Sequence, residues 1–253
     1  MRSFFRVSEL LTELFSALRD ADPEYSVRRA VSEGDRNAAY RVRHRVYCDE
    51  RKFEPPTPFG MEFDAYDAAG STSSLLLSTR LGTVCGAVRL VFPDEKCGQT
   101  LPIDEFSQQK KMAANLRRVR ESCSCAELSR LCVLPDFRGV WGKQDLLLGA
   151  FAEAVKRDVG AILAVADPRF AKYLTKQQID FVQIGDPVEK NGARLPILIG
   201  TEPNFDRWLE LVGEAERRTD FSSLIPLRRQ PDTQLLGWSP CPAQLKPMIF
   251  GCE

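Results

Sequence analysis

The sequence is poor in the residues from which metal sites are built. Its 253 residues include one histidine, His44, and eight cysteines that form no C-x-x-C pair. A zinc site that uses histidine at regular spacing is therefore excluded, and we predict no metal site. We interpret the cysteines as free thiols in a reducing compartment, which predicts a cytoplasmic protein.

Net charge and long apolar runs are missing as well. Lys and Arg total 35, as do Asp and Glu, so bulk charge gives no reason to expect a nucleic-acid partner. No run approaches the ~18 apolar residues of a membrane-spanning helix. Charged residues interrupt the segment from Phe4 to Leu18, so we predict no secretory signal. Its apolar residues recur at helical spacing, which predicts an N-terminal amphipathic helix within residues 1–24 that packs on the core or makes peripheral contact with a membrane.

What is present is an alternation of strand and helix patterns. Strands are expected at Tyr25–Val31, Leu75–Thr79, Val84–Phe92, Ala126–Val133, Gly160–Ala166, Asp180–Ile184 and Leu195–Gly200. Helices are expected at Asp35–Glu50, Lys143–Arg157 and Pro168–Lys176. This order predicts an α/β domain over residues 25–202, with helices on both faces of a mixed central sheet. Residues 203–253 are expected to add a C-terminal helix and a Pro-rich tail.

Charged residues fall at positions that should be buried. In the helix over 35–50, Ala39, Val42 and Val46 define an apolar arc, and Arg43 and Tyr47 lie in or beside it. The opposite, solvated face is expected to carry Arg41, His44 and Arg45. An inward arginine is costly unless carboxylates pair with it, although an arginine that extends to solvent at the edge of the core is an equal alternative.

Acidic partners occur after a Pro-rich loop. Asp64 and Asp67 are three residues apart, so one turn of chain presents both to the same place, unless they are simply solvated loop acids. Arg89 lies among apolar strand residues and requires a buried partner or a substrate carboxylate. Such a charge cluster drawn from separate elements is more often a functional site than an accident of structure.

The strand over 126–133 adds more polar side chains. Glu127 and Ser129 share one face by alternation, and Arg130 lies opposite unless a bulge intervenes.

Four motifs together carry a resemblance to known enzymes. They are Val42–Glu54, Gly60–Asp67, Ala87–Leu90 and Glu127–Leu131. In order and spacing they resemble the acyl-homoserine-lactone synthases, the related N-acyl amino acid synthases and the acyltransferases associated with exosortase systems. The resemblance implies a fold similar to the Gcn5-related acetyltransferases, and an acceptor pocket formed by Arg43, Asp64, Asp67, Arg89, Glu127 and Arg130. Ser129, Tyr47 and Phe53 are expected beside it; the last two stand where the lactone synthases look to have Phe and Trp, which leaves the acceptor open.

The same resemblance places the acyl donor next to the loop over 133–143. The residues expected to contact the donor are Leu131, Cys132, Val133, Arg138, Gly139, Gly142 and Lys143. The usual R-x-x-G-x-G/A spacing is broken by Trp141 and Lys143, which favours a phosphopantetheine arm on an acyl carrier protein over coenzyme A. A basic stretch is the predicted docking surface for an acidic carrier, with a solvated helix as the alternative; it comprises Lys110, Lys111, Arg117, Arg118 and Arg120.

The predicted activity is transfer of a long-chain acyl group from the thioester of acyl carrier protein, or from acyl-CoA, to the amine of an amino acid or similar small amine. Glu127 is the predicted base, and Arg89 and Arg130 complete the predicted catalytic set. Arg43, Arg89 or Arg130 is expected to fix the acceptor's carboxylate, and no tightly bound cofactor is expected. Two alternatives stay open. One is a lactone synthase that uses S-adenosylmethionine, and the other is a non-catalytic module with the same fold.

Overall fold

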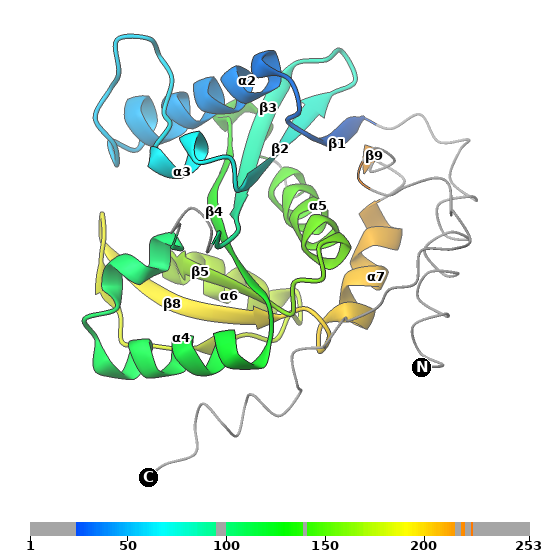
Figure 1. Cartoon of the computed structure of the whole chain (residues 1–253). Coiled ribbons are helices and arrows are strands. Elements are labelled where there is room, and N and C mark those ends of the chain that lie inside the picture. Colours follow the sequence, from blue (N-terminus) through cyan, green and yellow to red (C-terminus); the bar gives the residue numbers. More distant parts are fainter. Residues whose placement is uncertain (1–23, 95–99, 139–140, 216–218, 221–223, 225–253) are drawn as a thin grey trace.

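The computed structural model describes residues 24–94, 100–138, 141–215, 219–220 and 224 (Figure 1). The expected N-terminal helix and most of the Pro-rich tail lie outside these residues. No helix in the described ranges is long and apolar enough to cross a membrane.

A single mixed sheet runs through the molecule. Its strand order is β6-β8-β5-β4-β3-β2-β1-β9, with β7 paired to β8. Neighbouring strands are antiparallel except for the pairs β4–β5 and β1–β9. The strands are β1 Tyr25–Arg29, β2 Thr72–Thr79, β3 Val84–Val91, β4 Cys125–Val133, β5 Ala161–Ala166, β6 Val182–Gln183, β7 Val188–Glu189, β8 Ala193–Gly200 and β9 Thr219–Asp220.

Helices cover both faces of this sheet, as predicted. They are α2 Glu33–Arg43, α3 Ala65–Ala68, α4 Lys110–Ser122, α5 Gly142–Lys156, α6 Pro168–Lys176 and α7 Phe205–Ala215, with a π-helix at His44–Glu50 and 3₁₀ turns at Pro102–Phe106 and Pro135–Phe137. Helix α2 packs on β2, β3 and β4 through Ala39 and Val42, and α4 packs farther along the same face, over β5 and β8, through Met112 and Leu116. The other face is covered by α5, α6 and α7 (Figure 1). The expected fold class is confirmed.

The helix predicted over 35–50 changes type at its midpoint. It begins with a capping box between Ser32 and Asp35 and continues as α-helix to Arg43, where the wider π-helix takes over. Because a π-helical turn holds an extra residue, side chains beyond Arg43 rotate relative to an ideal α-helix. His44 is therefore buried and accepts a hydrogen bond from the Thr57 N–H at 3.2 Å, so its predicted place on the solvated face is wrong. Arg41 and Arg45 are exposed, as predicted.

The C-terminal elements are part of the same core. Trp208 of α7 stacks on Phe151 of α5, with ring centroids 4.2 Å apart, and Leu224 is buried in the cluster around α5. The short strand β9 pairs with β1 and forms that edge of the sheet.

The close packing around α5 gives a first testable prediction. A Cβ placed on Gly149 would lie 2.6 Å from the Val27 side chain and 3.1 Å from that of Leu224. Gly149→Ala is therefore expected to lower the free energy of unfolding by about 1–3 kcal/mol, measured by denaturant titration. The matched control is Gly34→Ala, at an exposed helical position with no close neighbour, where alanine should be neutral or stabilising. Equal stability of the two variants would contradict this packing.

Candidate active site

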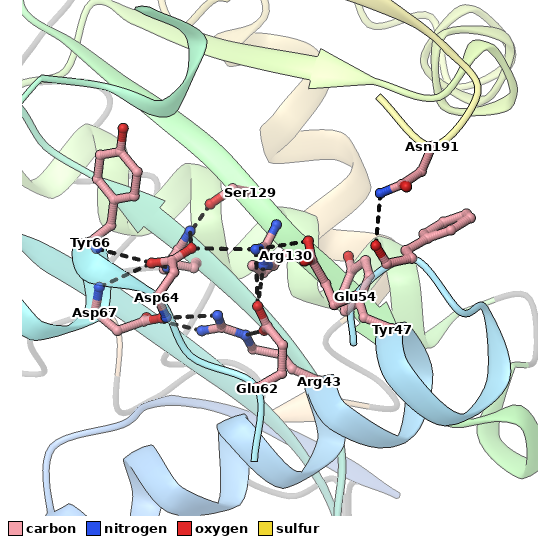
Figure 2. Close-up of polar contacts among 12 residues, drawn as sticks. Arg43, Tyr47, Glu54, Glu62, Asp64, Tyr66, Asp67, Ser129, Arg130 and Asn191 are labelled. Atoms are coloured by element: carbon pink, nitrogen blue, oxygen red, sulfur yellow. Dashed lines mark hydrogen bonds and ion pairs between the residues drawn. The ribbon is translucent and has the colours of Figure 1, made fainter. Parts of the chain in front are cut away.

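Three arginines from three elements meet on the sheet face that α2 covers. Arg43 ends α2, Arg89 lies in β3 and Arg130 lies in β4. Arg43 and Arg89 are each only 1% exposed. Figure 2 shows Arg43 and Arg130 pointing toward the same group of carboxylates, so residues from distant parts of the sequence form one cluster.

A bulge in β4 brings Arg130 into this cluster. Ser129 pairs with Arg89 and Cys132 with Ala87, so two residues of β4, Arg130 and Leu131, lie opposite one residue of β3. Arg130 has a φ of 54°, a left-handed conformation that costs a residue other than glycine about 1–2 kcal/mol. The alternation of the strand, which would place Arg130 on the far face, is broken by this bulge.

Glu62 is the buried bridge between two of the arginines. Its carboxylate accepts a hydrogen bond from Arg43 Nε at 2.5 Å and another from Arg130 Nε at 3.0 Å. A buried carboxylate is tolerated only when it is paired in this way.

Asp64 and Asp67 form a second bridge at the start of α3. Each side chain accepts a hydrogen bond from the other residue's backbone N–H, in a capping box. Asp64 also accepts two hydrogen bonds from Arg89, at 2.6 and 2.9 Å, and Asp67 accepts two from Arg43, both at 2.9 Å. The three-residue spacing thus presents both acids to the same site, as predicted.

Among the nitrogens of these three guanidinium groups, one makes no hydrogen bond within the described residues. Every nitrogen of Arg43 and Arg89 that can donate contacts a carboxylate or the Ser129 hydroxyl. Arg130 uses Nε and Nη2, toward Glu62, Glu54 and Asp64, and its Nη1 has no hydrogen bond within the described residues. Burial opposes ionisation of Asp64, but hydrogen bonds from Arg89 and the charges of Arg130 and Arg43 outweigh it and hold the pKa of Asp64 below its usual range.

Glu127 is buried beside this network but is not paired with an arginine. Its Oε2 accepts a hydrogen bond from the Ile103 N–H at 2.6 Å. Burial raises the pKa of Glu127 to about 8, against the opposing effects of that hydrogen bond and of the Arg89 charge. Glu127 is also the last residue of β4 that pairs with β5, opposite Leu163. Beyond it the two parallel strands are not paired in the described chain.

Tyr47 lies beside Arg130, and Phe53 lies beside Tyr47. The Arg130 guanidinium lies 5.6 Å from the centre of the Tyr47 ring, and the Tyr47 hydroxyl donates to the Leu131 carbonyl at 3.1 Å. The Phe53 ring is 6.4 Å from Tyr47. Asn191, on the loop before β8, donates to the Phe53 carbonyl at 3.0 Å (Figure 2).

Comparisons with known proteins identify the fold that carries this cluster. A model of the acetyltransferase (GNAT) domain matches residues 42–147. The chain has the GNAT fold. The superfamily resemblance expected from the sequence is therefore confirmed at the level of fold.

Solved structures with this fold include enzymes of the expected kinds. FeeM, an N-acyl amino acid synthase from uncultured soil microbes, is 16% identical, with a TM-score of 0.56 over 71% of this chain and 92% of FeeM. TofI, in a complex with an inhibitor and MTA, is 19% identical, with a TM-score of 0.58 over 76% of this chain and 99% of TofI. BjaI is a CoA-dependent acyl-homoserine lactone synthase solved with SAM and isopentyl-CoA. It is 19% identical, with a TM-score of 0.58 over 79% of this chain and 96% of BjaI. A search of curated protein sequences found no match.

On this GNAT fold, the two cations that were predicted to contact the acyl donor, Arg138 and Lys143, contact other protein groups. Arg138 donates to Val133 O at 2.8 Å and forms a two-point ion pair with Glu50. The Lys143 amine lies 4.3 Å from the centre of the Tyr173 ring, and burial lowers its pKa. Gly142 is in tight contact with Leu77, since an added Cβ would lie 3.0 Å from it. Gly139 lies outside the described residues.

The other residues that were predicted to contact the acyl donor lie at the end of β4. Cys132 and Val133 are buried, and burial raises the pKa of the Cys132 thiol to about 12, which leaves it a neutral thiol at physiological pH. Because a thiolate is the reactive form of cysteine, Cys132 is poorly suited to act as a nucleophile.

The basic stretch predicted as a docking surface lies on α4. Lys110, Lys111, Arg117 and Arg118 are exposed, whereas Arg120 forms an ion pair with Asp104 at 2.7 Å. The helix and the turn before it line a surface groove of about 540 Å³ that includes Arg117, Arg120 and Asp104.

Two acids of the network, Glu62 and Glu54, are not among the predicted site residues. Glu62 lies two residues before Asp64, so its position in the extended segment was a usable signal. Glu54, whose carboxylate is 3.3 Å from Arg130 Nη2, follows the π-helix and gave no such signal. No group of His, Cys, Asp and Glu side chains suited to a metal ion occurs among the residues that the structure describes.

Proposed function

We propose that the chain is an N-acyltransferase that moves a long-chain acyl group from a thioester to the amine of an amino acid or similar small amine. The observation that carries the proposal is Glu127, whose raised pKa of about 8 suits a base working near neutral pH. It lies on a GNAT fold, where β4 and β5 cease to pair.

The chemical step is direct attack on the thioester. The neutral amine nitrogen bonds to the thioester carbonyl carbon, and Glu127, directly or through water, accepts the proton that the nitrogen loses. The C–S bond then breaks, and the leaving thiolate takes up a proton to give the free thiol of the donor. The oxyanion that forms in between is stabilised by backbone N–H groups of β4 near Leu131 to Val133.

Arg130 is the residue that holds the acceptor's carboxylate. Every guanidinium nitrogen of Arg43 and Arg89 already donates to a protein group, whereas Arg130 Nη1 has no hydrogen bond among the described residues and the Arg130 side chain is 18% exposed. The four carboxylates around three guanidiniums leave the network with excess negative charge, which attracts the ammonium form of the amine before it loses its proton.

The donor arm is best supplied by an acyl carrier protein. Arg138 and Lys143 are held by Glu50 and Tyr173, so neither is free to bind the phosphates of coenzyme A. The exposed cations of α4 offer an acidic carrier a complementary surface.

The test is an assay of the purified full-length chain with acyl-carrier protein, acyl-CoA and acyl-pantetheine as donors. Thiol release is measured with a panel of amino acids and with S-adenosylmethionine, and products are identified by mass spectrometry. We expect acyl amino acids, and similar KM values for acyl-CoA and acyl-pantetheine because the nucleotide makes little contact. A lactone formed from S-adenosylmethionine would replace this proposal by the lactone-synthase alternative. No thiol release from any donor would favour a non-catalytic module.

A further inference from the structure

The loop over residues 51–64 connects the network to the outside of the molecule. Its two stems carry Glu54 and Asp64, which contact Arg130, and its tip carries Phe59. Phe59 is 77% exposed and Phe63 is 56% exposed. One loop therefore holds both the acids of the site and two unusually exposed aromatic side chains.

The tip is held in place by hydrogen bonds. The Thr57 hydroxyl donates to Met61 O at 2.7 Å and accepts from Met61 N–H at 3.1 Å, which closes the tip. The Thr57 N–H donates to His44 and the Glu62 N–H donates to Tyr40 O, so the loop lies along the end of α2 and the π-helix (Figure 1). The chain on both sides of Phe59 is thus held by hydrogen bonds.

Exposed cations lie on the elements that the loop contacts. Arg41 and Arg45 are exposed and follow Tyr40 and His44, the two helix residues that bond to the loop, and Lys52 is exposed at the loop's first stem. The exposed residues Phe59, Phe63, Arg41, Arg45 and Lys52, here called the loop face, supply two aromatic rings and three cations, with Asp49 as an exposed acid on the same helical stretch. That combination is typical of surfaces that lie on anionic lipid, because the rings enter the interface while the cations meet the phosphates.

We propose that the loop face binds the surface of an anionic bilayer. The proposal rests on the proposed function in one respect: the product, a long-chain acyl amide, is far more stable in a membrane than in water, by about 0.8 kcal/mol for each buried CH₂. A loop that touches both the site and the bilayer provides a short route for that product. The cations and exposed rings of the loop face favour lipid over a second copy of the chain, which would present the same cations.

The test measures binding of the full-length chain to vesicles by co-sedimentation, with no acyl donor or amine present. Vesicles of phosphatidylglycerol and phosphatidylcholine in equal parts are compared with phosphatidylcholine alone. We expect binding to the anionic vesicles that weakens as salt is added. Phe59→Ser should weaken it about 10-fold, because a ring loses its apolar burial. The double variant Arg41→Glu with Arg45→Glu should weaken it by at least as much.

Leu81→Ser is the matched control, since Leu81 is 93% exposed at the turn between β2 and β3. It should bind as the unchanged chain does. The proposal is overturned if the unchanged chain ignores anionic vesicles, if Phe59→Ser binds as well as the unchanged chain, or if Leu81→Ser is weakened equally. Concentration-dependent dimers abolished by Phe59→Ser, without vesicle binding, would also overturn it in favour of a second copy. Because no thioester is used, failure of this test leaves the acyl-transfer proposal standing, and thiol-release assays can fail without affecting vesicle binding.

Discussion

Replacing Glu127 by glutamine is expected to lower the turnover of acyl transfer by about 100-fold or more, because the amide cannot accept the proton of the attacking amine. The pH profile should distinguish this loss from a general defect. Since the pKa of Glu127 is raised to about 8, the rate of the unchanged enzyme should increase with pH up to that region as the carboxylate forms. The variant's residual rate should lack this dependence. The turnover and its pH dependence are measured for both proteins by thiol release with saturating acyl donor and amine.

The stability of the same variant provides an internal control. In the unfolded chain Glu127 ionises near its ordinary pKa of 4.5, whereas in the folded chain it stays protonated up to about 8. Between these values the folded state binds more protons, so this group's contribution to the free energy of unfolding decreases as pH rises. Glutamine does not ionise, so Glu127→Gln removes this decrease in stability with rising pH. The variant should be at least as stable as the unchanged chain at pH 8. A variant that keeps most of its rate would exclude Glu127 as the base, and one that fails to fold would contradict the burial argument. Glu105→Gln, at an exposed acid nearby, should change neither quantity.

Removing Arg43 is expected to destabilise the fold by about 3–5 kcal/mol, because Arg43→Ala leaves buried carboxylates without their cation. The side chains of Arg43, Glu62 and Asp67 are 1%, 7% and 2% exposed, so water cannot replace the lost partner. The measurement is the free energy of unfolding from denaturant titration. The free energy of unfolding of Arg43→Lys should lie between that of the unchanged chain and that of Arg43→Ala. One ammonium group keeps the positive charge but cannot make the separate contacts to Glu62 and Asp67 that the guanidinium makes.

The matched control for this variant is Arg45→Ala. Arg45 is two residues away on the exposed side of the same helical stretch, so its loss should change stability by no more than about 0.5 kcal/mol. A similar cost for both variants would show that helix propensity, and not buried pairing, determines the effect. A small cost for Arg43→Ala would mean that the carboxylates take up protons or rearrange, and the network would then not be a rigid support for Arg130.

Much of the local structure could be predicted because its causes are local. The helix Pro168–Lys176 has the predicted bounds, since Asp167 caps it and Pro168 fits its first turn. The hairpin between β2 and β3 turns at Gly82, whose φ of 82° suits glycine. Asp64 and Asp67 share a site because three residues of separation make one turn of chain. In each case the residues that determine the structure are neighbours in the sequence.

Other features depend on contacts between distant residues. Glu62 lies 19 residues from Arg43 and 68 from Arg130, and its spacing to Asp64 indicates a shared face but not these two partners. The left-handed bulge at Arg130 costs free energy locally and is compensated by the ion pairs it makes possible, so strand alternation alone places Arg130 on the wrong face. His44 is buried for a similar reason, since the π-helix and the Thr57 contact outweigh α-helical periodicity.

The sequence by itself therefore determined most of the longer strands and helices, the α/β class of the fold and the residue types available for a site. Only the tertiary structure decided that Arg130 keeps a nitrogen without a hydrogen bond, and that Glu127 has no arginine partner and a raised pKa. It also decided that Arg138 and Lys143 of the acyl-donor loop already contact Glu50 and Tyr173. The physical reason is that propensity and periodicity act over a few residues, whereas burial and ion pairing depend on groups that folding alone brings into contact.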